Sequence, residues 1–289
     1  MAILAALGFS AKAIFVKLAY ASAPVEAVTL LALRMAFSLP IFVWVGLRES
    51  RNATPLTWRE WLAVVVLGLL GYYGASILDF LGLQYITAGL ERLILFTYPT
   101  LTLLLGGLLY GQAIGRREWS AVALCYAGIA AAFAHDLNLS ATASAVWIGG
   151  GFVFASSLSY ALYLSGSGPM LARIGVMRFT ALAMLVSTAA VFGHFLTVQP
   201  IQALAQPPSV YAYALAMALF STIIPVFAQS AAIRRIGSGR AALIGTVGPL
   251  MTIVLGWWLL GESISTWQMA GAALVVAGVV LVSRKGRAA

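Results

Sequence analysis

Charged residues are scarce in this chain, which holds 17 lysines and arginines and 8 aspartates and glutamates among 289 residues. They make up 9% of the sequence, whereas a typical soluble domain has about 25%. Hydrophobic residues make up 62%, and the mean hydropathy is +0.98. Such a chain cannot cover its surface with polar groups in water. The composition therefore excludes a soluble globular fold and predicts an integral membrane protein.

Cysteine and histidine are nearly absent as well. The single cysteine, Cys125, excludes a disulfide within the chain, and we interpret it as a small core residue. The two histidines, His135 and His194, belong to no set of residues with the spacing of metal ligands or of a nucleophile and its base. No glycine-rich phosphate-binding loop is found either. We therefore expect neither an enzyme nor a metal or cofactor site.

Long apolar runs occupy most of the remaining sequence. Runs such as 61–71 and 269–282 are unbroken, which favours membrane-spanning helices over the alternating pattern of a β-barrel. A spanning helix needs roughly 20 apolar residues, so the chain has room for about ten. The predicted fold class is an all-α membrane protein with ten transmembrane helices, at 2–21, 27–47, 60–82, 86–110, 117–134, 145–165, 174–197, 209–230, 239–260 and 266–283.

The basic residues of the predicted loops fall on one side of the membrane. If the N-terminus is cytoplasmic, 13 of the 17 lysines and arginines lie in cytoplasmic loops or in the C-terminal tail. The opposite loops carry only acidic charges, Glu26, Asp136 and Glu262. This asymmetry predicts a multi-pass protein of the inner (plasma) membrane with both termini in the cytoplasm. It also accounts for the net charge of +9, so we expect no nucleic-acid partner.

An internal repeat appears when the chain is shifted by 150 residues. The shift superposes identical residues in the two halves: Pro99 on Pro249, Gly111 on Gly261, Ile114 on Ile264 and Gly128 on Gly278. We predict two five-helix repeats, 1–140 and 141–289. Because five is odd, the second repeat must cross the membrane in the opposite sense. Inverted repeats of this kind are typical of secondary transporters, which bind substrate where the halves meet.

The second half carries a recognisable set of motifs. It has Pro249, then Leu260-Gly261-Glu262, then a glycine-rich last span. With these motifs the chain resembles the EamA type of the drug/metabolite transporter superfamily, and Arg34 in the span 27–47 resembles the arginine region of the family's second helix. The first half departs from the pattern, because Tyr110-Gly111-Gln112 lacks the glutamate. We therefore interpret Glu262 as a topological or capping residue.

The resemblance carries expectations about architecture and substrate. It implies a central cavity lined by the first four spans of each half, with the fifth spans, 117–134 and 266–283, at the periphery. Family members export amino acids and other metabolites, and relatives carry nucleotide sugars or sugar phosphates. The aromatic-rich spans are most similar to those of amino-acid exporters, with aromatic amino acids as one substrate class. The oligomeric state is left open, and a monomer is compatible with this architecture.

Few charges lie inside the predicted spans, where each costs about 2.5–3.5 kcal/mol at the bilayer centre. We single out Lys12, Asp79, Glu91 and Arg92 as substrate-binding or gating residues. Asp79 can pair with Lys12 or Lys17. Glu91 and Arg92 either meet a substrate carboxylate or ammonium, or pair with Lys12 or Asp79 during gating, or form an ion pair that reaches the outer interface. Proton coupling would require Glu91 or Asp79 to titrate in the cavity.

Aromatic and hydroxyl side chains near the middle of spans form a second candidate group. A mid-span tyrosine hydroxyl needs a polar partner, which favours a wet cavity, and its ring can bind a substrate ammonium. Serine in a span can instead link helices. The candidates are Tyr72, Tyr73, Tyr98, Ser156, Tyr160 and Tyr163.

The paired prolines Pro99 and Pro249 complete the prediction. Each is expected to remove a hydrogen bond from its helix and to kink it, either as a hinge of alternating access or as a fixed bend. We predict a secondary transporter that exports small metabolites. A nucleotide-sugar or sugar-phosphate carrier is the alternative, and a channel or an intramembrane enzyme is a more distant one, since no ring of charges or filter is visible.

Overall fold

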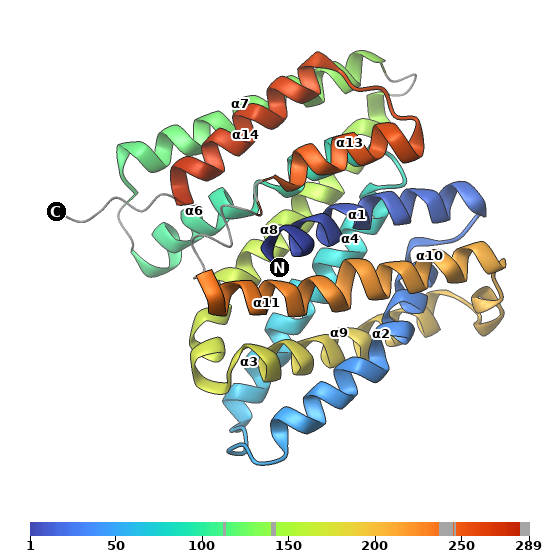
Figure 1. The fold of residues 1–289 in the computed structure, drawn as a ribbon, viewed down its shortest axis with the longest axis vertical. Helices are drawn as coiled ribbons and strands as arrows, with labels where there is room; N and C mark the ends of the chain where they lie inside the picture. Colours follow the sequence, from blue (N-terminus) through green and yellow to red (C-terminus); the bar gives the residue numbers. More distant parts are fainter. Residues whose placement is uncertain (112–113, 140–142, 237–244, 246, 284–289) are drawn as a thin grey trace.

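The computed structural model describes residues 1–111, 114–139, 143–236, 245 and 247–283, and this part of the chain is helical without strands (Figure 1). The first half contains α1 Ala2–Ser22, α2 Ala27–Ser50, α3 Trp58–Gly68, a π-helix Leu69–Gly74, α4 Ala75–Gly82, α5 Ala88–Leu95, α6 Tyr98–Tyr110 and α7 Arg116–Leu139. The second half contains α8 Ala143–Ile174, α9 Val176–Val198, a 3-10 helix Ile201–Leu204, α10 Pro208–Ala218, a π-helix Leu219–Ile223, α11 Ile224–Ile236, α13 Gly248–Leu260 and α14 Thr266–Ser283.

The sequence repeat is present in the backbone. The two π-helices begin at Leu69 and Leu219, which are 150 residues apart. α6 and α13 both end at a glycine in the left-handed conformation, Gly111 with φ 64° and Gly261 with φ 67°. Glycine adopts this conformation without the steric cost that other residues meet. The repeated motif therefore encodes a repeated helix end.

The two halves pack against each other in a reciprocal way. α4 of the first half packs on α8, and its counterpart α11 packs on α1. In the same manner α3 packs on α9 and α10 packs on α2. α2 packs on α9 and α7 on α14, and the second pair lies side by side at one end of the long axis (Figure 1). Exchanging the halves reproduces each contact, so the molecule has approximate two-fold symmetry.

Glycines bring α7 and α14 into close backbone contact. A Cβ atom at Gly128 would lie 2.5 Å from the carbonyl oxygen of Gly271. A Cβ atom at Gly278 would lie 2.5 Å from Cys125 Sγ and 2.7 Å from the carbonyl oxygen of Ala121. The two contacts are related by the shift of 150 residues. Small residues at such positions are the usual means of close helix packing in a membrane.

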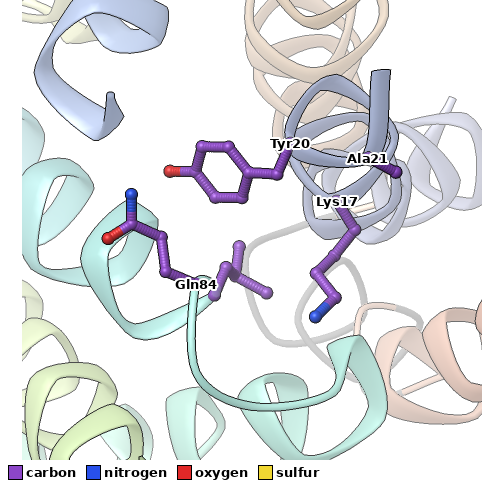
Figure 2. A pocket seen from close by; sticks show the side chains of 5 residues that line it. Lys17, Tyr20, Ala21 and Gln84 are labelled. Carbon is purple, nitrogen blue, oxygen red and sulfur yellow. The ribbon is translucent and has the colours of Figure 1, made fainter. Parts of the chain in front are cut away.

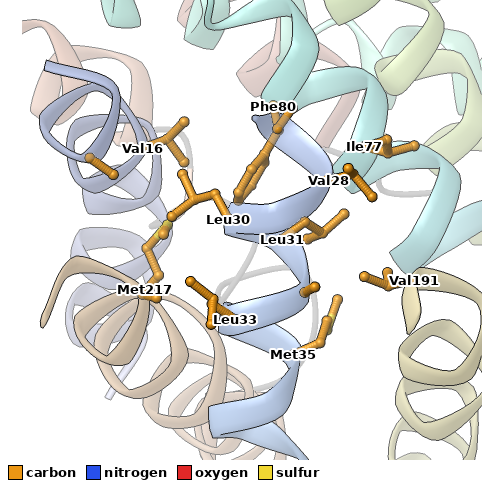
Figure 3. Close-up of a cluster of buried hydrophobic side chains, with 14 of the residues drawn as sticks. Val16, Val28, Leu30, Leu31, Leu33, Met35, Ile77, Phe80, Val191 and Met217 are labelled. Carbon is orange, nitrogen blue, oxygen red and sulfur yellow. The ribbon is translucent and has the colours of Figure 1, made fainter. Parts of the chain in front are cut away.

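The largest core cluster joins both halves around α2 (Figure 3). Leu30, Leu31 and Met35 of α2 are fully buried. They lie among side chains of α1, α4, α9 and α10, including Phe80 and Met217. In lipid, burial of such side chains brings little hydrophobic gain, so close packing holds these helices together.

Seven helical stretches of the described chain are long and apolar enough to cross a membrane. They are Ala2–Ser22, Ala27–Ser50, Trp58–Gly82, Ala88–Leu109, Ala143–Ile174, Val176–Val198 and Pro208–Gln229. Gly248–Leu260 and Thr266–Leu281 are shorter apolar helices. The all-helical membrane fold is thus confirmed, whereas the count of ten spans stays a prediction. Part of the predicted span 239–260, together with Arg240 and the basic C-terminal tail, lies outside the described residues.

Two predicted spans differ in detail from the structure. The span 86–110 corresponds to the apolar stretch Ala88–Leu109, but it is not one continuous α-helix, because α5 ends at Leu95 and α6 begins at Tyr98. The span predicted at 145–165 ends too early, because α8 continues through Pro169 to Ile174 and is followed by Gly175 with φ 82°. Pro169 lacks the N–H for one backbone hydrogen bond of α8, but the helix continues past it. The helix ends where Gly175 adopts a positive φ.

The sequence predicts that Pro99 and Pro249 kink their helices, but neither proline lies in the interior of a helix. Each occupies the first turn of a helix, α6 and α13 respectively. The N–H groups of a first helical turn have no partner within the helix, so proline loses nothing there. For α6 the break therefore lies before the proline, at Phe96 and Thr97. Whether the prolines act as hinges stays a prediction.

Candidate functional site

Three charged side chains from different helices meet inside the helical bundle. Lys12 Nζ of α1 lies 2.7 Å from Asp79 Oδ2 of α4 and 3.7 Å from Glu91 Oε1 of α5. Asp79 is 1% exposed, Glu91 is 0% exposed, and the Lys12 side chain is 18% exposed. The predicted pairing of Asp79 with Lys12 is confirmed, and Glu91 joins the same cluster.

The two carboxylates of this cluster depend on one ammonium group. No donor among the described residues makes a hydrogen bond of good geometry to the carboxylate oxygens of Asp79 or Glu91. Lys12 is the ion-pair partner of both, and it lies closer to Asp79. Burying a charge is costly unless it is paired and hydrogen-bonded. Glu91 is therefore the less compensated of the two acids.

Arg92 links α5 to α1 and α13. Its Nε donates to Thr252 Oγ1 of α13 at 3.0 Å, and its Nη2 donates to the carbonyl oxygen of Phe9 in α1. Thr252 in turn donates to the carbonyl oxygen of Ser10 at 3.3 Å. Arg92 is 5% exposed. Since Glu91 and Arg92 are both buried, the interpretation of an ion pair that reaches the outer interface is wrong.

A second buried cation lies on the α2 side of Asp79. The guanidinium of Arg34 lies over the Phe80 ring, 5.2 Å from its centroid, and donates to Ser76 Oγ at 3.1 Å. We had not placed Arg34 among the site residues. The signal that could have found it was the same one that found Lys12, a charge within an apolar run.

Four of the predicted tyrosines form one cluster between the first π-helix, α6 and α8. The hydroxyls of Tyr72 and Tyr163 are 3.1 Å apart. The Tyr160 ring stacks on Tyr163 with centroids 5.6 Å apart and meets Tyr98 edge-on at 5.1 Å. Phe179 of α9, which the sequence did not suggest, also stacks on Tyr163, with ring centroids 6.1 Å apart. Both halves thus contribute rings.

Tyr73 and Ser156 lie apart from this cluster. The Tyr73 hydroxyl is 3.0 Å from His194 Nδ1 of α9. Ser156 Oγ donates to the carbonyl oxygen of Ala75 at 2.6 Å, and Ser159 donates to that of Leu70 at 2.7 Å. These serines link α8 to the neighbouring helix, so the structure favours the helix-linking alternative for Ser156.

A pocket of about 450 Å³ opens at the ends of α1 and α4 (Figure 2). It is lined by Lys17, Tyr20 and Ala21 from α1 and by Leu83 and Gln84 after α4. Lys17 Nζ donates to the carbonyl oxygen of Ile86 at 3.0 Å, and the Tyr20 hydroxyl donates to that of Phe80 at 2.9 Å. The pocket lies beyond the charged cluster along both helices.

The family model for EamA-like transporters matches this chain twice, over residues 1–134 and 147–284. The chain belongs to the EamA-like transporter family. The two matches agree with the two halves seen in the backbone, although the domain limits of 1–140 and 141–289 stay a prediction. Membership makes this a membrane transporter, and it names no substrate.

Relatives of this EamA-like chain carry equally general names. An uncharacterized transporter of Bacillus subtilis, YcbK, is 29% identical over 276 residues, which cover 91% of this chain and 85% of the relative. An uncharacterized transporter of Archaeoglobus fulgidus is 22% identical over 271 residues, 94% of each chain. A solved crystal structure with 19% sequence identity shares the fold, with a TM-score of 0.62 and coverage of 96% of this chain and 95% of that one.

The Leu-Gly-Glu motif of this EamA-like chain supports the site directly. Glu262 Oε1 accepts a hydrogen bond from the Ala88 N–H at 2.9 Å, at the first residue of α5. Thr87 caps the same helix by accepting from the Leu90 N–H at 3.2 Å. A carboxylate at a helix N-terminus satisfies a free donor and interacts well with the helix dipole. The capping role predicted for Glu262 is confirmed, and the capped helix is the one that carries Glu91 and Arg92.

At the end of the molecule opposite the pocket, arginines of the second half hold a loop of the first. Arg178 donates to Ser50 Oγ at 3.2 Å and to the carbonyl oxygen of Thr54 at 3.0 Å. Arg173 donates to Thr54 Oγ1 at 3.3 Å and pairs with Glu60 at 3.0 Å. The charge asymmetry of the sequence predicts that the segment between α2 and α3 and the junction of α8 and α9 both lie on the cytoplasmic side, and these contacts join the two segments.

Proposed function

We propose that this EamA-like protein is a secondary transporter of the inner (plasma) membrane that exports small metabolites, with amino acids, aromatic ones in particular, as its substrates. One observation supports this substrate class above others. Buried charges of both signs lie at the junction of α1, α4 and α5, and a cluster of four tyrosines lies beside α5. An aromatic amino acid carries the matching groups: a carboxylate, an ammonium and a ring.

Each part of the site has a complementary group on such a substrate. Arg92 and Lys12 are cations for the carboxylate, and Glu91 and Asp79 are acids for the ammonium. Tyr98 belongs to the tyrosine cluster and follows Arg92 by six residues along the chain. Offset and edge-on contacts with aromatic rings contribute about 0.5–1.5 kcal/mol per pair. A substrate ring placed among Tyr98, Tyr160 and Tyr163 would gain several such contacts.

We further propose alternating access between two inverted five-helix repeats, with ten spans and both termini in the cytoplasm. The two-fold exchange of contacts between the halves supports two states of similar energy. The break between α5 and α6, just before Pro99, lies next to both candidate groups and supports a hinge there. Discontinuous helices near the substrate site are a recurring feature of carriers with inverted repeats.

The test is uptake by proteoliposomes that contain the purified protein. Labelled phenylalanine, alanine, uridine and glucose 6-phosphate serve as probes, and phenylalanine is expected to be transported fastest. Tyr160→Leu removes two ring contacts, at 5.1 and 5.6 Å, and is expected to lower phenylalanine transport roughly tenfold. Tyr85→Leu, at a ring that is 43% exposed, is the matched control and should change transport less than twofold.

Two outcomes would contradict the proposal. Preferred transport of glucose 6-phosphate or uridine would instead support a carrier for phosphorylated sugars or nucleosides, with the buried cations binding phosphate or hydroxyl groups. Equal effects of the two tyrosine substitutions would remove the tyrosine cluster from the substrate site.

A further inference from the structure

The charged cluster has one negative charge more than its direct pairing can balance. Lys12 contacts two buried carboxylates, at 2.7 Å for Asp79 and 3.7 Å for Glu91. An ammonium group neutralises one carboxylate, and the shorter distance assigns it to Asp79. The Glu91 carboxylate is fully buried, has no hydrogen bond of good geometry among the described residues, and faces the Asp79 carboxylate. A second buried carboxylate beside the first is costly unless another positive charge joins it.

Two other buried cations act on the acids through space but donate their hydrogen bonds elsewhere. Arg92 directs its donors to Thr252 and Phe9, and Arg34 on α2 lies over Phe80. Tyr20 of α1 donates to a backbone carbonyl. Further outward, Lys17 donates to a backbone carbonyl and Glu262 caps α5. α13 carries no charged residue, and α8 has only Arg173, at its far end.

The pocket between α1 and α4 lies near the cluster along both helices. Lys17, which lines the pocket, lies five residues after Lys12, about 7.5 Å along the helix axis. Leu83, on its other wall, lies four residues after Asp79, about 6 Å along the axis. Two residues that line the pocket therefore lie little more than one helical turn along α1 and α4 from Lys12 and Asp79. The Lys12 side chain is 18% exposed.

We propose that Glu91 is a proton-binding site and that this transporter exchanges its substrate for a proton. On the outer side, an O–H bond forms between a Glu91 carboxylate oxygen and a proton delivered by hydronium, which leaves as water. Lys12 then pairs with Asp79 alone. On the inner side the O–H bond breaks, the proton passes to water, and the carboxylate is free for a substrate ammonium. Proton and substrate compete for one charge, so one enters as the other leaves.

This inference rests on the proposed export function, and two measurements separate the failure of one from the failure of the other. The first needs no substrate. Infrared spectra of the detergent-solubilised protein are recorded against pH, and the C=O stretch of a protonated carboxyl group is followed. Wild type is expected to lose this band as the pH rises. Glu91→Gln should lack the titrating band, and Glu49→Gln, at an exposed glutamate on α2, should keep it.

The second measurement uses proteoliposomes that are loaded with phenylalanine and with a pH-sensitive dye. Dilution into phenylalanine-free buffer should acidify the lumen for wild type and for Glu49→Gln. Glu91→Gln should show no acidification and no pH-driven accumulation. Its phenylalanine exchange at equal concentrations should fall as well, because the substrate ammonium loses its carboxylate partner, and any exchange that remains should no longer depend on pH. A melting curve of each variant checks that it is folded.

Several results would overturn the inference. A carboxyl band that is unchanged in folded Glu91→Gln would place the proton elsewhere, even if no amino acid were transported. Phenylalanine efflux without acidification in wild type would refute proton coupling and leave the transport function intact. Accumulation driven by a sodium gradient, with no effect of a pH gradient, would assign the site to sodium.

Discussion

Gly71 offers a direct way to disturb the tyrosine cluster without changing any of its residues. Gly71 lies in the first π-helix, and a Cβ atom there would be 2.5 Å from Cδ2 and 2.9 Å from Cδ1 of Tyr163. Ordinary van der Waals contact begins at 3.4 Å. The substitution Gly71→Ala therefore forces the Tyr163 ring to move by about 1 Å.

The surroundings of Tyr163 resist such a movement. Its ring is stacked on Phe179 at 6.1 Å and on Tyr160 at 5.6 Å. Overpacking a well-packed core typically costs about 1–3 kcal/mol. A shift of this size would also break the 3.1 Å contact between the Tyr72 and Tyr163 hydroxyls, at a further cost of about 0.5–1.5 kcal/mol. The expected destabilisation is therefore roughly 2–4 kcal/mol.

Cys125 supplies the stability assay. It is the only cysteine and is buried between α7 and α14, so a thiol-reactive dye reports its exposure during thermal unfolding. Gly71→Ala is expected to lower the melting temperature by about 5 °C or more and phenylalanine uptake by roughly tenfold. The control is Gly151→Ala in α8, where a Cβ atom would meet nothing within 4 Å. Both substitutions raise the helix propensity by the same amount, so the difference between their melting temperatures and uptake rates reports the clash with Tyr163 alone. Equal melting temperatures and uptake rates would refute the reasoning.

Two further predictions concern the scaffold around the site. Glu262→Ala removes the acceptor for the Ala88 N–H and is expected to lower the free energy of unfolding by about 0.5–2 kcal/mol. The melting temperature in the same dye assay should fall accordingly. Glu262→Gln keeps an accepting oxygen and should retain most of the stability. Equal losses for the two variants would exclude the cap. A cysteine placed at the exposed Asn52, in a cysteine-free background, should react with a membrane-impermeant maleimide only from the cytoplasmic side. Labelling in intact cells would reverse the proposed topology.

The sequence was sufficient for the membrane fold, the repeat and part of the charged cluster. Apolar runs and a repeat at a fixed shift of 150 residues are visible in the linear order of the residues, so they can be recognised without coordinates. The pairing of Lys12 with Asp79 could also be predicted, because a charge in the middle of a span must find an opposite charge at the same depth. The position of Glu91 beside them required the packing of α5 against α1.

Helix breaks were beyond the reach of sequence patterns. A proline in an apolar run reads as a kink, yet Pro99 begins α6 and Pro169 lies inside α8. The difference depends on which backbone carbonyls find other partners. At the end of α5, Ser157 of α8 donates to the carbonyl oxygen of Leu95 at 3.0 Å, so the helix can stop there. Such compensation comes from the opposite half of the molecule and leaves no local pattern.

The charges of the site do not follow the symmetry of the scaffold. The cluster residues have uncharged counterparts at the repeat distance: Leu162 for Lys12, Gln229 for Asp79 and Ala241 for Glu91. The second half supplies instead Tyr160 and Tyr163, together with Glu262 at the start of α5. A symmetric scaffold can exchange two conformations of similar energy, but a symmetric site would present the same chemistry in both. Because the acids belong to one half alone, the proposed exchange of states would change their access to a proton, while Tyr160 and Tyr163 of the opposite half would contact the ring of the proposed substrate.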